Sequence, residues 1–204
     1  GRPQAVMVHV NVGTGNTINN VTNAARDRAP LILAAGRTPF TEKGSFGSRS
    51  RSIHWAQEMF DQAGMLREMV KWDYELKVPE QAADVAARAY EMTMTSPRGP
   101  VYLVLPREPL SAPVSDALAS APRQLPVPGH PDPQAIATLA EWIAKAEQPL
   151  IVTSSDGDPR AVAALSKLAE RYALPVVSHN ARVVTLPASH PMHAGYDSAP
   201  LLPD

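Results

Sequence analysis

The stretch His9-Val-Asn-Val-Gly-Thr-Gly-Asn16 decides how this chain folds. An apolar run from Val6 to Val10 leads into it, and a run with helical spacing starts at Thr17. This order predicts a β-strand, a glycine turn and an α-helix, with Asn16 capping the helix through an early backbone N–H. In α/β proteins such a junction commonly presents a ligand site.

The glycine pattern differs from the dinucleotide-binding fingerprint. Asn19 and Asn20 stand where the third glycine of that fingerprint would fall. The turn is therefore not expected to bind a dinucleotide.

Composition limits the classes of protein to consider. The chain has 204 residues, of which 44% are hydrophobic, enough for one large or two smaller cores. Lys and Arg number 19 against 20 Asp and Glu, which disfavours a nucleic-acid partner. Cysteine is absent, so disulfides and thiolate chemistry are excluded. No segment approaches the roughly 18 apolar residues of a membrane span, and we expect a soluble, cytoplasmic protein without membrane or nucleic-acid partners.

Apolar strands alternate with amphipathic helices along the chain, which indicates an α/β fold. The polar segment from Arg37 to Arg51 is predicted to be a surface loop. A helix with Trp55, Met59, Ala63 and Leu66 on its buried side is expected after Ser52. The other elements predicted in this half are a strand at Leu31–Ala35 ended by Gly36, an extended piece at Val70–Trp72, a helix beginning at Pro79 and a strand at Val101–Leu105.

Prolines then recur without any period, which is typical of a linker. The alternation restarts afterwards. The elements predicted there are helices at Pro133–Ala146 and Pro159–Tyr172 and strands at Leu150–Thr153 and Pro175–Val177.

Several of these segments together resemble the thiamine-diphosphate-dependent enzymes of the acetolactate synthase and benzoylformate decarboxylase type. The resemblance covers nearly the whole chain. It rests on His9–Asn16 followed by Asn23–Gly36, on Val70–Tyr74 and Gly99–Pro106, and in the second half on Gln148–Val152, Leu174–Val177 and His190–Gly195.

The resemblance implies two partial doubly wound parallel-sheet domains joined by a Pro-rich linker. Residues 1–112 would be the later part of the pyrimidine-binding domain, 113–132 the linker, and 133–204 the first part of the central domain. The glutamate that activates the cofactor would precede this segment, and the diphosphate and magnesium site would follow it. The chain is therefore expected to be an internal fragment, inactive by itself.

The implied function is decarboxylation of a 2-oxo acid, or acyl transfer and carboligation, with thiamine diphosphate and Mg²⁺ as cofactors. FAD or ADP could bind the central domain, and the substrate could also be an acyl-CoA. The resemblance also implies that the intact enzyme is a homodimer or homotetramer, because in the relatives the cofactor lies between domains of two subunits. One alternative is a nucleotide- or flavin-binding module without thiamine chemistry, and another is an interaction fragment with no ligand.

The resemblance also suggests site residues. His9 matches a histidine that faces the reactive carbon of the cofactor, where an imidazole can move protons; the alternative is an inert, hydrogen-bonded core histidine. Gly13, Thr14, Gly15 and Asn16 would lie near the pyrimidine ring. Gln57 matches a glutamine that can face substrate or flavin.

Other polar residues have simpler interpretations. Ser155-Asp156-Gly157 with Asn180 imitates the spacing of a magnesium motif, but the alternative is a polar turn in which Asp156 or Asp158 caps the next helix. No metal ligand is predicted. His54 and His179 are isolated, and His190 and His193 are expected in a surface loop. The cations of the Arg37–Arg51 loop could meet an anionic substrate or coenzyme A phosphates, or simply be solvated.

Overall fold

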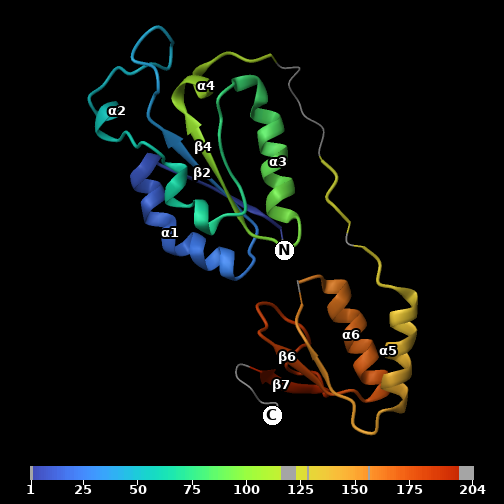
Figure 1. Ribbon diagram of the computed structural model, residues 1–204. Helices are drawn as coiled ribbons and strands as arrows, with labels where there is room; N and C mark the ends of the chain where they lie inside the picture. Colours follow the sequence, from blue (N-terminus) through green and yellow to red (C-terminus); the bar gives the residue numbers. More distant parts are fainter. Residues whose placement is uncertain (1, 116–122, 128, 156, 198–204) are drawn as a thin grey trace. The chain divides into compact units, whose positions relative to one another are not determined.

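The computed structural model describes residues 2–115, 123–127, 129–155 and 157–197. Contacts divide the chain into two compact units, Gly1–Val127 and Pro128–Asp204. Each unit has its own sheet and helices (Figure 1).

The first unit contains a four-stranded parallel sheet in the order β1-β2-β4-β3. Leu33 of β2 pairs with Tyr102 of β4 at its centre. Strand β4 is buried along almost its whole length, which explains why its sequence is apolar without alternation. The strands are β1 (Gln4–Val8), β2 (Leu31–Arg37), β3 (Asp73–Glu75) and β4 (Pro100–Pro106). The predicted parallel α/β architecture is confirmed.

Helices cover both faces of this sheet. Helix α1 (Val10–Arg26) and the 3-10 helices η1 (Ala63–Met65) and η2 (Arg67–Met69) pack on one face, in a core centred on Val21, Leu66 and Tyr102. Helix α3 (Ala82–Met94), which follows the 3-10 turn η3 (Pro79–Gln81), packs on the other face through Val85 and Ala89. Figure 1 shows α1 and α3 on opposite sides of β2 and β4.

The prediction of a long helix after Ser52 is wrong. Only α2 (Ile53–Ala56) forms there, and the chain then continues through η1 and η2. Trp55 is 47% exposed, whereas Leu66 is fully buried. After the break, the Asp61 carboxylate accepts the backbone N–H of Gly64 at 2.9 Å, so a new short helical turn starts at η1 and α2 is not continued.

Smaller differences concern strand ends. Strand β2 continues through Gly36 to Arg37, and the third strand begins at Asp73 rather than at Val70. Directly after β4 the short helix α4 (Arg107–Ser111) forms, which the sequence did not predict.

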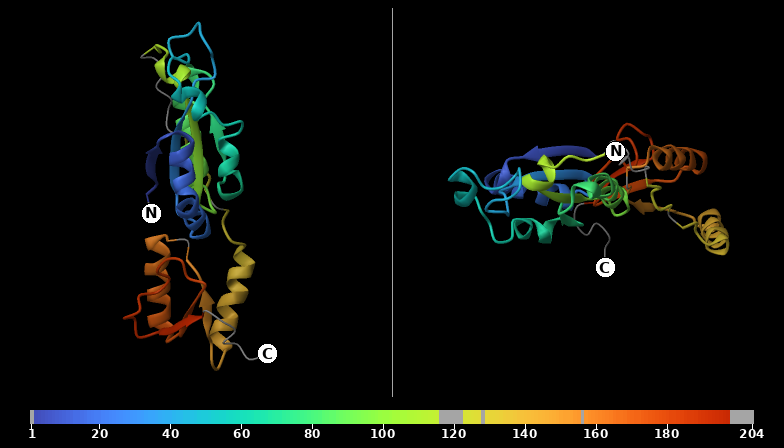
Figure 2. Two further views of the ribbon diagram at one scale, coloured as in Figure 1. Left: turned by 90° about the vertical axis from the view of Figure 1, so that its left-hand side faces the viewer. Right: turned by 90° about the horizontal axis from the view of Figure 1, so that it is seen from above.

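The second unit contains a three-stranded parallel sheet in the order β5-β6-β7. Its elements are α5 (Pro133–Lys145), β5 (Ile151–Thr153), α6 (Pro159–Tyr172), β6 (Val176–His179) and β7 (His193–Asp197). Helix α6 packs on the sheet around Ala169, Val176 and Leu186. Helix α5 has no buried residue, and in the view from above it lies apart from α6 (Figure 2).

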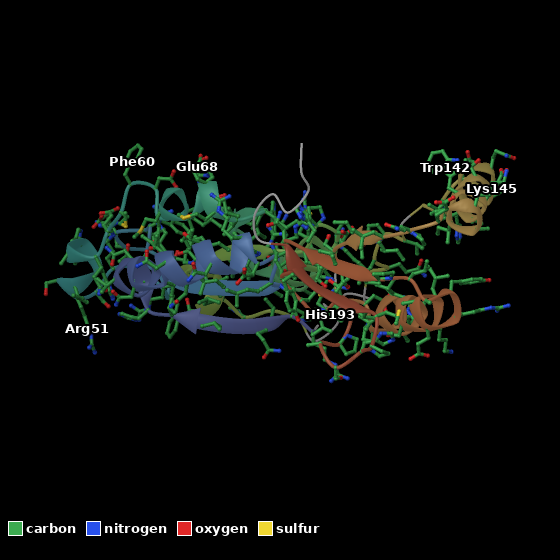
Figure 3. The ribbon with its side chains drawn as sticks, turned by 90° about the horizontal axis from the view of Figure 1, so that it is seen from below. Arg51, Phe60, Glu68, Trp142, Lys145 and His193 are labelled. Atoms are coloured by element: carbon green, nitrogen blue, oxygen red, sulfur yellow. The ribbon has the colours of Figure 1, made fainter. Side chains whose placement is uncertain are left out.

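Strand β7 was not predicted, so His193 lies at the start of a strand and not in a surface loop (Figure 3). The reason is its unusual sequence: the strand is only five residues long and contains Gly195 at φ +117°. The pairing also shifts register between Val176 and Val177, so the strand shows no simple apolar alternation.

The proposed domain boundaries stay a prediction. Residues 116–122 and 128, in the predicted linker, lie outside the described residues. Within the ranges that the structure describes, no helix is long and apolar enough to cross a membrane.

Candidate functional site

The carboxyl ends of the four strands of the first unit meet at one edge of its sheet. Because all four strands are parallel, β1 ends there at Val8, β2 at Arg37, β3 at Glu75 and β4 at Pro106. Ligands of open α/β sheets bind at this edge. The segments that follow these strands therefore define the candidate site.

His9 occupies the junction between β1 and α1. It is the N-cap residue of α1, its side chain is exposed, and it forms no capping hydrogen bond. The next residue, Val10, is buried with φ +46°, a left-handed conformation that is strained for a β-branched side chain. Strained backbone of this kind clusters at functional sites. His9 is thus not an enclosed core histidine.

The prediction of a glycine turn before the helix is wrong. Helix α1 begins at Val10, so Gly13, Gly15 and Asn16 all lie inside it, and Asn16 is not its N-cap. Gly13 is needed for close packing: a Cβ at this position would lie 3.0 Å from the Val8 Cβ and 3.2 Å from the Val8 carbonyl carbon. Strand and helix therefore meet directly, without an intervening loop.

The predicted site residues divide between two faces of α1. His9, Val12 and Asn16 are exposed, and their spacing places them on one side of the helix. Thr14 is fully buried on the opposite side. Gly15 lies between, where a Cβ would contact only the Met65 Cε, at 3.4 Å. His9 and Asn16 therefore lie on the same side of α1, about two turns apart, while the side chain of Thr14 faces the core.

Thr14 belongs to a buried chain of hydrogen bonds. Its hydroxyl donates to the Val10 carbonyl at 2.7 Å and lies 2.7 Å from the Tyr102 hydroxyl, which in turn accepts from Gln62 Nε2 at 3.0 Å. Gln62 Nε2 also donates to the Gly36 carbonyl at 2.9 Å. Since Thr14 uses its proton on Val10, Tyr102 is the donor to Thr14. The chain thus ties α1, β2, β4 and the segment before η1 together at the site edge.

Two residues of this hydrogen-bond network, Tyr102 and Gln62, were missed by the sequence analysis. Burial raises the pKa of Tyr102, and its hydrogen bonds with Thr14 and Gln62 act in the opposite direction. Tyr102 is the single polar side chain in an apolar strand, a signal that could have been used because buried tyrosine hydroxyls need a partner. Gln62 gave no such signal. Its Oε1 is buried and forms no hydrogen bond in the structure.

The Arg37–Arg51 loop is anchored by ion pairs. Arg49 donates to both carboxylate oxygens of Glu58, at 2.9 and 2.6 Å, and its guanidinium stacks 5.5 Å from the Trp55 ring centre. The Arg49 guanidinium holds the pKa of the Glu58 carboxyl below its usual value. Arg37 pairs with Glu75. These two arginines are therefore neutralised within the fold.

A buried glutamate fixes the same loop from the β4 side. Glu108 Oε1 accepts from the Thr41 backbone N–H at 2.8 Å and from the Thr41 hydroxyl at 2.7 Å. Gly47 passes so close that a Cβ there would lie 2.7 Å from the Glu108 Cα. Gln57, the predicted substrate contact, is half-buried at the end of α2.

In the second unit, Asp158 caps α6 by accepting the Arg160 backbone N–H at 2.9 Å, which confirms the structural alternative for this turn. Asp156, the carboxylate of the possible magnesium motif, lies outside the described residues. Among the residues that are described, no three His, Asp or Glu side chains gather as a metal site would require. An apolar groove of about 670 Å³ lies between α5, β5 and α6.

Comparison with known families gives two matches to one group of enzymes. Residues 1–65 match the model of the thiamine pyrophosphate enzyme N-terminal TPP binding domain. Residues 136–199 match the model of the thiamine pyrophosphate enzyme central domain. Together the two matches cover more than half of the chain, in the order predicted from the sequence.

Individual proteins agree with this result. Benzoylformate decarboxylase of Pseudomonas aeruginosa is 27% identical, over 96% of this chain and 36% of its own length. A Methanocaldococcus jannaschii protein that carries the name of an acetolactate synthase large subunit is 24% identical, over 90% of this chain and 30% of its own length. The crystal structure of benzoylformate decarboxylase from Polynucleobacter necessarius superposes with a TM-score of 0.70 at 25% identity, covering 96% of this chain and 35% of that one.

The chain thus spans about a third of the length of the curated relatives it matches. Both of its halves correspond to domains of one kind of protein, and the fold agrees with a solved member. The chain belongs to the thiamine pyrophosphate enzymes, the thiamine-diphosphate-dependent family of decarboxylases and acetolactate synthase-like enzymes.

Proposed function

We propose that this chain is part of an enzyme that breaks or forms the carbon–carbon bond next to the carbonyl of a 2-oxo acid. The observation that carries this proposal is the position of His9. It is exposed at the carboxyl end of β1, beside a strained Val10, within the segment that matches the TPP binding domain. The relation to benzoylformate decarboxylase supports a 2-oxo acid as substrate.

The residues at this edge fit thiamine diphosphate. His9 and Asn16 offer an imidazole and an amide on one face of α1, while Gly13 and Gly15 let the helix pack closely against Val8 and Met65. An aromatic ring with nitrogen donors and acceptors can use both groups. We propose that Gly13, Gly15 and Asn16 contact the cofactor, and that Thr14 supports them from the core through Tyr102.

His9 has the catalytic role in this proposal. When bound, thiamine diphosphate supplies the carbon nucleophile and the electron sink that cleavage beside a carbonyl requires. The exposed imidazole ring of His9 is a group that can pass a proton to and from a substrate. Since it has no capping bond to hold it in place, it can turn toward the substrate carbonyl oxygen. Gln57 is proposed as a second substrate contact.

The remaining parts of the site are proposed to come from elsewhere. We propose that magnesium and the diphosphate are held at a surface contributed by another domain or by another subunit of a homodimer or homotetramer. All three phenylalanines of the chain are exposed in the segment after β2, Phe60 completely (Figure 3). Exposed aromatic side chains of this kind are typical of surfaces that become covered on assembly.

Some expectations from the sequence stay open. A cytoplasmic location and an acyl-CoA substrate stay predictions. The alternative of a flavin- or nucleotide-binding module draws no support from the matched families.

The test uses the full-length gene product with thiamine diphosphate and Mg²⁺. Carbon dioxide release is measured with pyruvate, benzoylformate, phenylpyruvate and oxalyl-CoA. We expect release from at least one of them, and His9→Ala should lower kcat about 100- to 10,000-fold, the usual contribution of a positioned proton-transfer group.

Asn19→Ala, an exposed change further along the same helix, is the matched control and should leave kcat unchanged. No turnover of any 2-oxo acid, or wild-type turnover by the His9→Ala variant, would contradict the proposal.

A further inference from the structure

Three polar side chains from two different segments meet near the carboxyl ends of β2 and β4. Arg107 is the first residue of α4, and Ser50 and His54 belong to the segment around α2; α2 and α4 both lie beyond the arrowheads of these strands in Figure 1. Arg107 Nη1 lies 3.4 Å from the Ser50 hydroxyl and 3.5 Å from His54 Nε2. The Ser50 backbone N–H lies 3.1 Å from His54 Nδ1.

The protons of His54 follow from these contacts. A backbone N–H can only donate, so His54 Nδ1 accepts from Ser50 and the neutral ring carries its proton on Nε2. Nε2–H then faces Arg107 Nη1, which is also a donor. Two donors cannot bond each other. Because the two nitrogens lie only 3.5 Å apart, one acceptor placed beside them can bond to both.

The protein itself places no carboxylate within ion-pair distance of Arg107 in the part of the chain that the structure describes. Arg49, by contrast, is paired with Glu58 and Glu42. The adjacent Glu108 is buried and bonded to Thr41. Arg107 is exposed and His54 half-exposed, so a ligand can reach both.

We propose that Arg107, His54 and Ser50 form a binding site for an oxyanion, the carboxylate or phosphate group of a ligand. Arg107 and His54 Nε2–H donate to its oxygens, and the Ser50 hydroxyl, which accepts from Arg107, can donate its own proton to the anion. The site lies at the sheet edge where ligands bind, but it does not depend on thiamine chemistry. The carboxylate could come from an organic acid, and the phosphate from a phosphorylated ligand or the free ion.

The test follows the ring nitrogens of the histidines by NMR in the ¹⁵N-labelled chain. Inorganic phosphate is titrated in one arm and pyruvate in the other, at constant ionic strength. We expect a saturable shift of the His54 Nε2 signal in at least one arm, and the arm that responds identifies the phosphate or the carboxylate as the source. His130, exposed in the segment before α5, is the internal reference and should not shift with saturation.

Two variants distinguish binding at these three residues from nonspecific attraction of the anion to positive charge. Arg107→Gln should weaken binding at least about tenfold, because a charged donor to the anion is lost. Arg51→Gln removes the same charge from an exposed side chain that projects away from the ribbon and makes no hydrogen bond to the three residues (Figure 3), and it should change binding less than about twofold. The proposal is overturned if His54 shifts no more than His130 in both arms, or if the two variants bind equally.

Discussion

Helix α1 of the first unit and helix α5 of the second show opposite relations between composition and burial. Helix α1 is rich in Asn, Thr and Gly, yet it buries Val10, Thr14 and Val21. Helix α5 has the more apolar sequence, but none of its residues is buried, and Ile136 and Trp142 are 49% and 69% exposed. Apolar spacing therefore predicts that a helix forms, and the neighbouring sheet decides how much of it is buried.

The two helices also begin differently. Asp132 caps α5 by accepting the Gln134 backbone N–H at 3.0 Å, and Pro133 occupies its first turn. Helix α1 has no side-chain cap at His9 and starts from a strained Val10. Its start is held by contacts with β1 and β4 instead. A helix fixed in this way leaves its N-cap side chain, His9, without a capping bond.

The largest effect is expected where α1 and β1 touch. In Gly13→Val, the new side chain would overlap Val8, whose Cβ lies only 3.0 Å from the position of the added Cβ. We expect a loss of about 3 kcal/mol in the free energy of unfolding, the upper range for overpacked cores. Urea denaturation monitored by amide hydrogen exchange measures the free energy of unfolding separately for each unit. Asn19→Val, the same kind of side chain at an exposed position of α1, should change it by less than about 0.5 kcal/mol.

The contrast with α5 is tested by one matched pair. Val21→Ala removes two methyl groups from a side chain that is 1% exposed, and it should cost about 2 kcal/mol. Ile136→Ala removes more carbon atoms from α5 but should cost less than about 0.5 kcal/mol in the same chain, because that side chain is half-exposed. Equal costs for the two variants would show that α5 is as well packed as α1, and the comparison would fail.

The same contrast explains how far the sequence could be interpreted. The α/β alternation and most elements followed from local patterns, because strands and helices of a parallel sheet have distinct periods. The order of the two domains followed from the family resemblance. The start of α1 did not. Gly13 suggested a turn, but it is small because Val8 packs against it, a contact between elements that no local pattern encodes.

Candidate site residues show the same limit. His9 was proposed because the segment around it resembles a known family, and its exposure agrees with the proposed role. His54 was set aside as isolated in the sequence. It comes to lie beside Arg107 only because β2 and β4 are neighbours, which brings Arg107 to the loop 53 residues before it. Chemistry that depends on sheet order becomes visible only in the fold.

The smallest expected effect concerns the buried hydrogen bonds behind α1. Tyr102→Phe removes the donor to Thr14 and the acceptor for Gln62, and we expect a cost of about 1.5 kcal/mol in unfolding free energy. Tyr74→Phe is the matched control, since the Tyr74 hydroxyl makes one long bond of 3.3 Å to Gln81 near the surface; its cost should stay below about 0.5 kcal/mol.

A double variant makes this test specific. If the Tyr102 and Thr14 hydroxyls act through their mutual bond, Tyr102→Phe should cost less in a Thr14→Val background than in the wild-type chain. Additive costs would mean that the two hydroxyls stabilise the first unit independently. Helix α1 would then be held at its start by apolar packing against β1 alone, and Tyr102 would have no part in positioning the face that presents His9.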